Sequence, residues 1–158
     1  LELWRWQIAE QQASHLMTGV PIAKLSPDGH SLAFVQQTDG QVSLGVRNLA
    51  SGETTYTRRV AQETYNARAS MREPDRRFFW SPSGEFLLYA WSENTDAWHE
   101  STLWMVSLDA QCQQRLMGPV SPSINVQWSA DDHLLALVVE PGPDRHHLFL
   151  LRHSEGDH

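Results

Sequence analysis

Few side-chain combinations in this sequence could carry out a reaction by themselves. A serine hydrolase needs a Gly-x-Ser-x-Gly turn, and the nearest run, residues 40–45, has the wrong spacing. The sequence also has no glycine-rich phosphate loop and no dinucleotide-binding fingerprint. The sequence does not identify a pair of carboxylates that could act as the two catalytic groups of a glycoside hydrolase. We therefore expect no catalytic residues within this chain, and its status as an enzyme stays open.

The eight histidines raise the question of a metal site. The adjacent pair at 146–147 would point to opposite faces of a strand, so both rings cannot bind one ion. Asp96, His99 and Glu100 offer three kinds of ligand in one segment, although such loop side chains are usually solvated. Residues 131–133 stand at a tight turn, where a turn role is favoured over a ligand role. We expect no metal and no cofactor.

Two segments are candidates for contact with a partner. Trp98 lies beside His99 in a polar stretch and has no counterpart elsewhere in the chain, and Trp is enriched at binding hot spots. Arg76 and Arg77 belong to the only basic cluster, which suits an acidic partner surface. The alternatives are a Trp98 ring folded over its own sheet and a solvated arginine loop. The expected interaction surface consists of residues 92–101 and 67–77.

The composition limits the kinds of partner. The chain has 158 residues and 18.0 kDa, enough for one domain or part of one. Hydrophobic residues make up 41%, charged residues 20%, and the mean hydropathy is -0.45, which argues against an integral membrane protein and a disordered one. A net charge of -7 argues against nucleic-acid binding, and no apolar stretch is long enough for direct membrane insertion. The single Cys112 cannot form an internal disulfide.

Three segments share one pattern: an apolar residue, a serine-led tight turn and a short apolar run. Their serines stand at positions 26, 81 and 129, with spacings of 55 and 48 residues. Gly29 and Gly84 can supply the positive φ that such a turn requires. The third copy has Ala130 and Asp132 in place of proline and glycine, which predicts a weaker turn. The three segments are residues 25–35, 80–90 and 128–138.

A second set of segments, 3–8, 44–49, 103–108 and 148–153, also repeats. Each is followed by a polar turn, and after three of these turns comes a further short outer strand. Each full unit therefore has four antiparallel strands in about 40–50 residues, which is typical of a β-propeller blade. The rival interpretation is a β-sandwich, but the aligned turns favour the propeller.

The repeat predicts an all-β chain of about three blades, a single β-propeller segment over residues 1–158. We expect a partial blade with two strands, two blades of four, and a last partial blade with three. Such a set does not close a ring by itself, so we expect part of a larger propeller or a homo-oligomer. The expected boundaries are 1–19, 20–61, 62–119 and 120–158.

The tryptophans at equivalent repeat positions are expected to pack between blades. Trp80 and Trp128 both precede the serine of a turn, and Trp4 and Trp104 share another position. The apolar run after each turn is expected to lie buried between neighbouring sheets.

The Ser-Pro-Asp-Gly-x-x-Leu-Ala-Phe pattern at residues 26–34 resembles the WD40-like repeat of the TolB-like β-propeller family. Residues 80–89 resemble the same repeat, and so does the stretch 44–53. This repeat also occurs in propeller domains of prolyl-oligopeptidase-type serine peptidases and in sensor or regulator proteins. The resemblance implies a periplasmic location, while a cytoplasmic one stays open.

From the resemblance and the missing catalytic motifs we expect a non-catalytic scaffold that binds a protein or peptide through loops. The alternative is the substrate-gating propeller domain of a prolyl-oligopeptidase or dipeptidyl-peptidase, because residues 91–104 look like the long hairpin of those propellers. Thr64 follows Glu63 where that family's segment has a second Glu, so no substrate site is carried over. A third interpretation, the sensor part of a membrane-tethered transcription regulator, requires a helix-turn-helix and a membrane span outside this chain.

Overall fold

The structure is a computed structural model that describes residues 1–39, 41–60, 78–91, 101–108, 112–120, 124–142 and 145–152. Within these ranges the chain forms thirteen β-strands and no helix, as the repeat predicts. In particular, no helix of the described part is long and apolar enough to cross a membrane.

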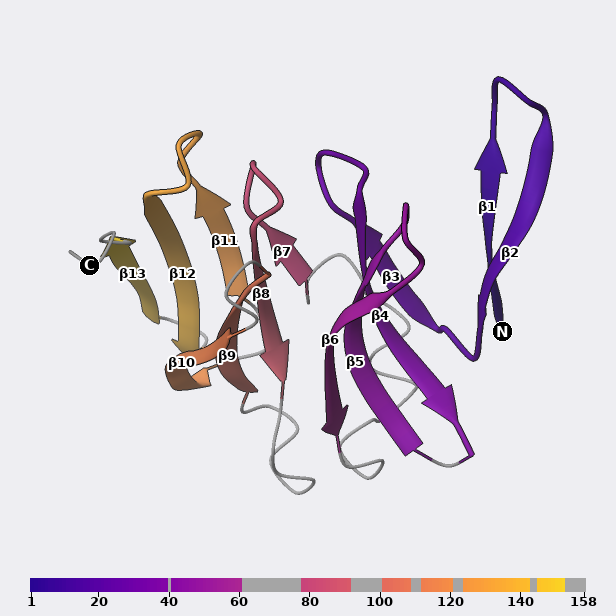
Figure 1. The fold of residues 1–158 in the computed structure, drawn as a ribbon. Coiled ribbons are helices and arrows are strands. Elements are labelled where there is room, and N and C mark those ends of the chain that lie inside the picture. Colours follow the sequence, from indigo (N-terminus) through magenta and orange to yellow (C-terminus); the bar gives the residue numbers. More distant parts are fainter. Residues whose placement is uncertain are drawn as a thin grey trace.

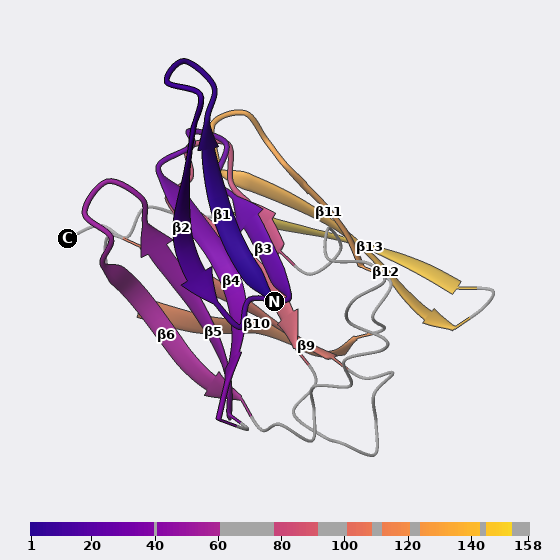
Figure 2. The ribbon, with the colours of Figure 1, turned by 90° about the vertical axis from the view of Figure 1, so that its right-hand side faces the viewer.

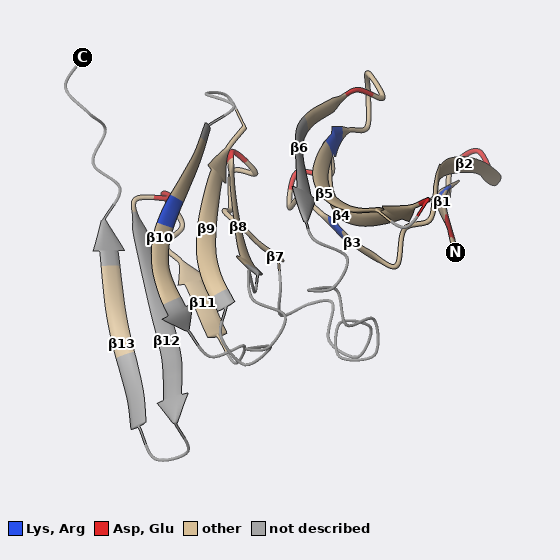
Figure 3. Cartoon of the chain, turned by 90° about the horizontal axis from the view of Figure 1, so that it is seen from below, with Lys and Arg blue, Asp and Glu red and all other residues tan. Residues whose placement is uncertain are grey.

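The strands form four antiparallel sheets that follow one another along the chain, with two, four, four and three strands (Figure 1). Each sheet is a meander, since every strand pairs with its neighbour in sequence. Seen from below, the sheets lie as successive layers (Figure 3). The first two sheets comprise β1 (Glu2–Gln7) and β2 (Gln12–Thr18), then β3 (Ile22–Leu25), β4 (Ser31–Thr38), β5 (Gln41–Asn48) and β6 (Thr54–Val60). The last two comprise β7 (Phe78–Trp80), β8 (Phe86–Trp91), β9 (Ser101–Ser107) and β10 (Cys112–Val120), then β11 (Ile124–Trp128), β12 (Leu134–Gly142) and β13 (Arg145–Arg152).

The second strand of each four-stranded sheet is buried on both faces, which confirms the expectation from its continuous apolar run. Successive side chains of a strand point to opposite faces, so alternate residues enter different layers of the core. In β8, Leu87 and Tyr89 pack toward the β3–β6 sheet, whereas Leu88 and Ala90 pack toward β11. The core is therefore a series of apolar layers between successive sheets.

The β1–β2 hairpin lies against the β3–β6 sheet (Figure 2), where Met17 and Val20 pack on Phe34 of β4. The chain passes from the hairpin to the sheet at Gly19, which has a φ of 73°. The backbone N–H of Gly19 donates to the Leu1 carbonyl oxygen at 2.7 Å, and the Gly19 carbonyl oxygen accepts the Gln37 N–H at 2.7 Å. This exit therefore joins the first two sheets by backbone bonds.

The expectation that all four repeated tryptophans pack between sheets is wrong for one of them. Trp80 is buried, and the partly buried Trp104 and Trp128 pack against the core clusters. Trp4 is 55% exposed, its Nε1 donates to Glu2 Oε2 at 3.2 Å, and its ring meets His15 edge-on. The reason is that β1 pairs only with β2, and within the described residues no further sheet covers this face of the hairpin.

Candidate functional site

The three serine-led turns share one backbone conformation. In each turn the residue three positions after the serine donates its backbone N–H to the carbonyl oxygen of that serine, at 3.0–3.2 Å. The same residue has positive φ, a region that glycine adopts at the lowest cost. The three donors are Gly29, Gly84 and Asp132, with φ values of 74°, 81° and 61°.

The side chain two positions after each serine holds the turn from inside. Asp28 Oδ1 accepts the Ser26 hydroxyl at 2.5 Å and the His30 backbone N–H at 3.0 Å. Asp131 makes the same pair of contacts with Ser129 and His133, and Ser83 takes this place in the middle turn. These hydrogen bonds, first the one from the serine hydroxyl, lower the pKa of both Asp28 and Asp131 below the ordinary aspartate value.

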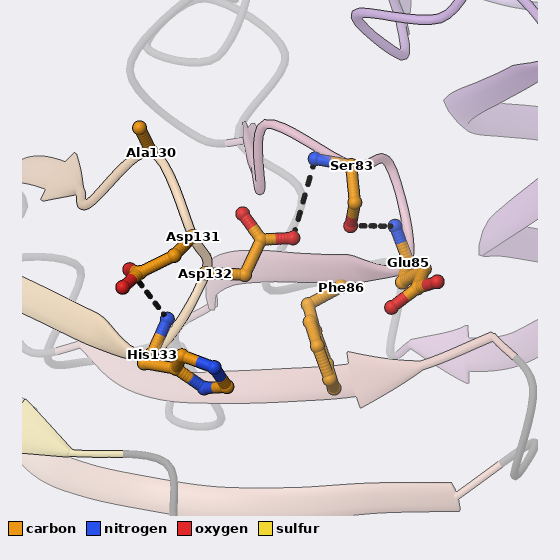
Figure 4. A pocket seen from close by; sticks show the side chains of 7 residues that line it. All are labelled: Ser83, Glu85, Phe86, Ala130, Asp131, Asp132 and His133. Atoms are coloured by element: carbon orange, nitrogen blue, oxygen red, sulfur yellow. Dashed lines mark hydrogen bonds between the residues drawn. The ribbon is translucent and has the colours of Figure 1, made fainter.

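The third turn adopts the same conformation without proline or glycine, but its bond from Asp132 N–H to the Ser129 carbonyl oxygen is 3.2 Å, against 3.0 Å in the other two turns. The expectation of a weaker turn stays a prediction. Asp132 adopts the left-handed conformation that glycine has in the other two turns. Aspartate tolerates this region better than most residues because its short polar side chain can hydrogen-bond locally. Asp132 is 9% exposed, and its Oδ2 accepts the backbone N–H of Ser83 at 3.2 Å. The side chain of Asp132, which a glycine would lack, therefore links this turn to the preceding sheet (Figure 4).

Neighbouring turns also meet at the first boundary between four-stranded sheets. A Cβ atom on Gly84 would lie 3.3 Å from the Asp28 carboxylate, so the glycine leaves room for this side chain. The turns consequently form a row at one end of the sheets, each in contact with the next.

A hollow of about 360 Å³ lies between the β7–β8 turn and the β11–β12 turn. Three of its lining side chains are carboxylates, and none is lysine or arginine. Asp132 Oδ1 is buried at this boundary and has no hydrogen-bond partner in the described part of the chain. The ring of Phe86 stacks on Trp128, with centroids 6.1 Å apart and planes at 20°. The lining residues, shown in Figure 4, are Ser83, Glu85, Phe86, Ala130, Asp131, Asp132 and His133.

This hollow is rich in hydrogen-bond acceptors and negative charge. It therefore suits a ligand group that donates hydrogen bonds and carries positive charge. Within the described ranges, no group of three His, Cys, Asp or Glu residues is arranged to hold a metal ion.

All four residues predicted from the sequence to contact a partner lie outside the described residues. Their placement therefore stays a prediction. The strands that precede the two predicted segments, β6 and β8, run away from the serine turns and end at the opposite end of their sheets (Figure 1). The four residues are Arg76, Arg77, Trp98 and His99.

Sequence reasoning did not single out the hollow. Glu85 and Phe86 look like ordinary residues of a turn and a strand, and for Asp132 the sequence favours a turn role over a ligand role. The available signal was an aspartate at a position where the other two copies have glycine. A non-glycine residue at positive φ often marks a functional site.

Comparison of the sequence with protein-family models gives no match, and comparison with curated proteins gives none either. Solved structures do match the fold. TolB from Acinetobacter baumannii has a TM-score of 0.61 and 13% identity over 99% of this chain and 36% of its own. The β-propeller domain of the trilobed protease from Pyrococcus furiosus has a TM-score of 0.57 and 13% identity, over 84% of this chain and 38% of its own. Acylaminoacyl peptidase from Pyrococcus horikoshii has a TM-score of 0.59 and 9% identity, over 95% of this chain and 27% of its own.

These similarities, together with the four meander sheets, show that the chain has a TolB-like β-propeller fold. At 9–13% identity the likeness concerns the fold alone. The chain spans less than half the length of each of the three proteins.

Proposed function

We propose that this chain is a non-catalytic β-propeller scaffold that binds a protein or peptide through the loops at the ends of its sheets. The observation that carries the proposal is the row of serine turns, in which backbone and side-chain bonds hold charged groups at defined positions. A surface that is ordered before binding loses less conformational entropy when a partner binds. The absence of a nucleophile turn anywhere in the 158 residues agrees with a binding role.

Bonds between the sheets support this role as a rigid frame. The Lys24 ammonium donates to the Phe78 carbonyl oxygen at 2.9 Å, and Trp80 Nε1 donates to the Lys24 carbonyl oxygen at 3.2 Å. The Asp132 carboxylate then joins the next sheet through Ser83. Loops carried on such a frame keep fixed relative positions, as a binding surface requires.

Photo-cross-linking tests the proposal. A photo-reactive phenylalanine analogue replaces Trp98 in one variant, and in a control variant it replaces Leu150, which is 71% exposed on β13. We expect the Trp98 position to give a discrete conjugate with a protein or peptide, and an excess of unlabelled chain to abolish it. Identical products from both positions, or products that the unlabelled chain does not compete away, would contradict the proposal.

A second candidate is the substrate-gating propeller domain of a serine peptidase. It is favoured by the fold likeness to a protease propeller domain and to an acylaminoacyl peptidase. The reading frame of the whole protein separates the two functions. A Gly-x-Ser-x-Gly turn with Asp and His partners in an α/β domain outside these residues would decide for the peptidase.

We further propose a periplasmic location, which follows from the TolB resemblance of the repeat. Fractionation of cells by osmotic shock, with a cytoplasmic marker followed in parallel, tests it. Recovery of the protein with the cytoplasmic marker would reject the location.

A further inference from the structure

We propose that the hollow between the β7–β8 and β11–β12 turns binds one positively charged side chain, a guanidinium or ammonium group, of a bound protein or peptide. The inference rests on the proposed function, since it assigns the cation to a partner of the scaffold. It concerns the turn end of the sheets, whereas the segments predicted from the sequence follow strands that end at the opposite end.

The first argument is an acceptor that the fold does not use. Asp132 is 9% exposed, and Ser83 N–H binds only its Oδ2, which leaves Oδ1 without a partner within the described residues. A buried acceptor of this kind is normally satisfied by a hydrogen-bond donor. Asp132 is one of the residues that line the hollow (Figure 4).

The second argument is the charge of the lining. Glu85, Asp131 and Asp132 come together from two sheets, and no lysine or arginine lines the hollow to neutralise them. The Ser129 hydroxyl and the His133 backbone N–H lower the pKa of Asp131, so this carboxyl group is ionised at neutral pH. Carboxylates bind guanidinium and ammonium groups through charge-assisted hydrogen bonds.

The third argument is the shape of the remaining wall. Phe86 lines the hollow and stacks on Trp128, which holds its ring in place. An aromatic ring can contact the planar guanidinium of arginine or the apolar stem of lysine. A basic side chain would therefore find carboxylates on one side and an apolar surface on the other.

The fourth argument is the conformational cost of the aspartate. Gly29 and Gly84 hold the same turn without a Cβ atom, so a glycine at position 132 would suffice for the turn itself. Asp132 instead adopts a φ of 61° and places a carboxylate between the sheets. A non-glycine residue in this region is uncommon and points to a role for its side chain.

The test uses the whole chain, labelled with ¹⁵N, and three short probes titrated in turn at low salt. The probes are acetyl-Gly-Arg-Gly-amide, its lysine counterpart, and a citrulline counterpart that has nearly the same shape as the arginine probe but no charge. We expect the two charged peptides to shift the backbone amide signals of Ser83, Asp132 and His133, and citrulline to leave them in place. High salt should weaken the effect because it screens the charges.

Two variants remove the carboxylate without disturbing the turn. Asp132→Gly restores the residue of the other two turns, and Asp132→Asn keeps an acceptor for Ser83 N–H and tolerates positive φ. In both we expect the Kd of the arginine peptide to rise about tenfold or more. Glu53→Gln is the matched control, since it removes one charge from the β5–β6 turn at the same end but outside the hollow. Its Kd should stay within about twofold of the starting protein.

Three outcomes would overturn the inference: equal shifts with citrulline, an unchanged Kd in both Asp132 variants, or displacement of the arginine peptide by millimolar calcium chloride. The last outcome would assign the hollow to a metal ion. Failure of these titrations with intact cross-linking at Trp98 would reject the hollow alone. Loss of cross-linking at Trp98 with intact titrations would reject the interaction surface at residues 92–101 and 67–77 and leave the hollow as a binding site.

Discussion

Trp80 Nε1 donates a hydrogen bond to the Lys24 carbonyl oxygen, 3.2 Å away, across the boundary between the two four-stranded sheets. The Lys24 ammonium reaches back to the Phe78 carbonyl oxygen at 2.9 Å, so the first strands of both sheets are joined in both directions. At the next boundary Trp128 has the position of Trp80 in the repeat. Its Nε1 is buried and has no hydrogen-bond partner among the described residues.

This contrast predicts different costs for the same substitution. Trp80→Phe removes a hydrogen bond and leaves the Lys24 carbonyl oxygen without its donor, so we expect a loss of about 1–3 kcal/mol in the free energy of unfolding. Trp128→Phe removes the same atoms but no hydrogen bond, and should cost less. Urea denaturation of the two variants gives the comparison. An equal or larger loss for Trp128→Phe would show that the Trp80 bond contributes little.

Gly19→Ala is expected to destabilise the contact between the first two sheets. A Cβ at position 19 would lie 2.2 Å from the Gln37 carbonyl oxygen, and the φ of 73° disfavours any side chain. Gly29→Ala is the control, since its φ is 74° but no atom lies within 4 Å of its added Cβ. We expect about 1–2 kcal/mol for the control, from the left-handed backbone alone, and a larger loss for Gly19→Ala. Similar losses in thermal or urea unfolding would contradict the predicted clash.

The Asp28 turn should make stability depend on pH in the acid range. Hydrogen bonds from Ser26 Oγ and His30 N–H lower the pKa of Asp28 in the folded protein. The group therefore stabilises the fold fully above its unfolded pKa of about 3.9, and this contribution is lost as the pH falls through the lower folded pKa.

Asp28→Asn isolates this contribution, because asparagine can still accept the His30 N–H but does not titrate. We expect the urea midpoint of the variant to fall less steeply than that of the starting protein between pH 5 and 2. Parallel curves for the two proteins would mean that Asp28 does not contribute to the acid sensitivity.

Replacing Trp98, Arg76 and Arg77 together by alanine should leave the fold intact and weaken binding of the cross-linked partner about tenfold or more. The matched control is the double variant Arg5→Ala and Arg115→Ala, which removes the same number of positive charges from two strand positions, the half-buried Arg5 and the exposed Arg115. Affinity is measured by calorimetry and folding by circular dichroism. Unchanged affinity in the triple variant would show that these two segments do not form the binding surface.

The strands and the turns could be predicted from the sequence alone, because both depend on residues that are close together in the chain. The turn at residues 26–31 forms from its own serine, aspartate and glycine, and the hydrogen bonds among its own residues span at most five positions. The continuous apolar run of β8 likewise predicted a strand buried on both faces, as the packing of Leu87 and Leu88 into different layers shows. Local periodicity and turn chemistry were sufficient for the fold class.

Which turns meet, and what they enclose, follows from the packing of the sheets in three dimensions. The bond from Ser83 N–H to Asp132 joins residues 49 positions apart, and it depends on how two sheets pack against each other. Packing also makes Trp4 and Trp104 differ in burial although they share a position in the repeat. Trp104 packs against the core because a neighbouring sheet covers it, and Trp4 stays exposed because no sheet within the described residues does. Contacts within a turn follow from adjacent residues, whereas contacts between turns follow from the distance and angle between sheets, which no local pattern specifies.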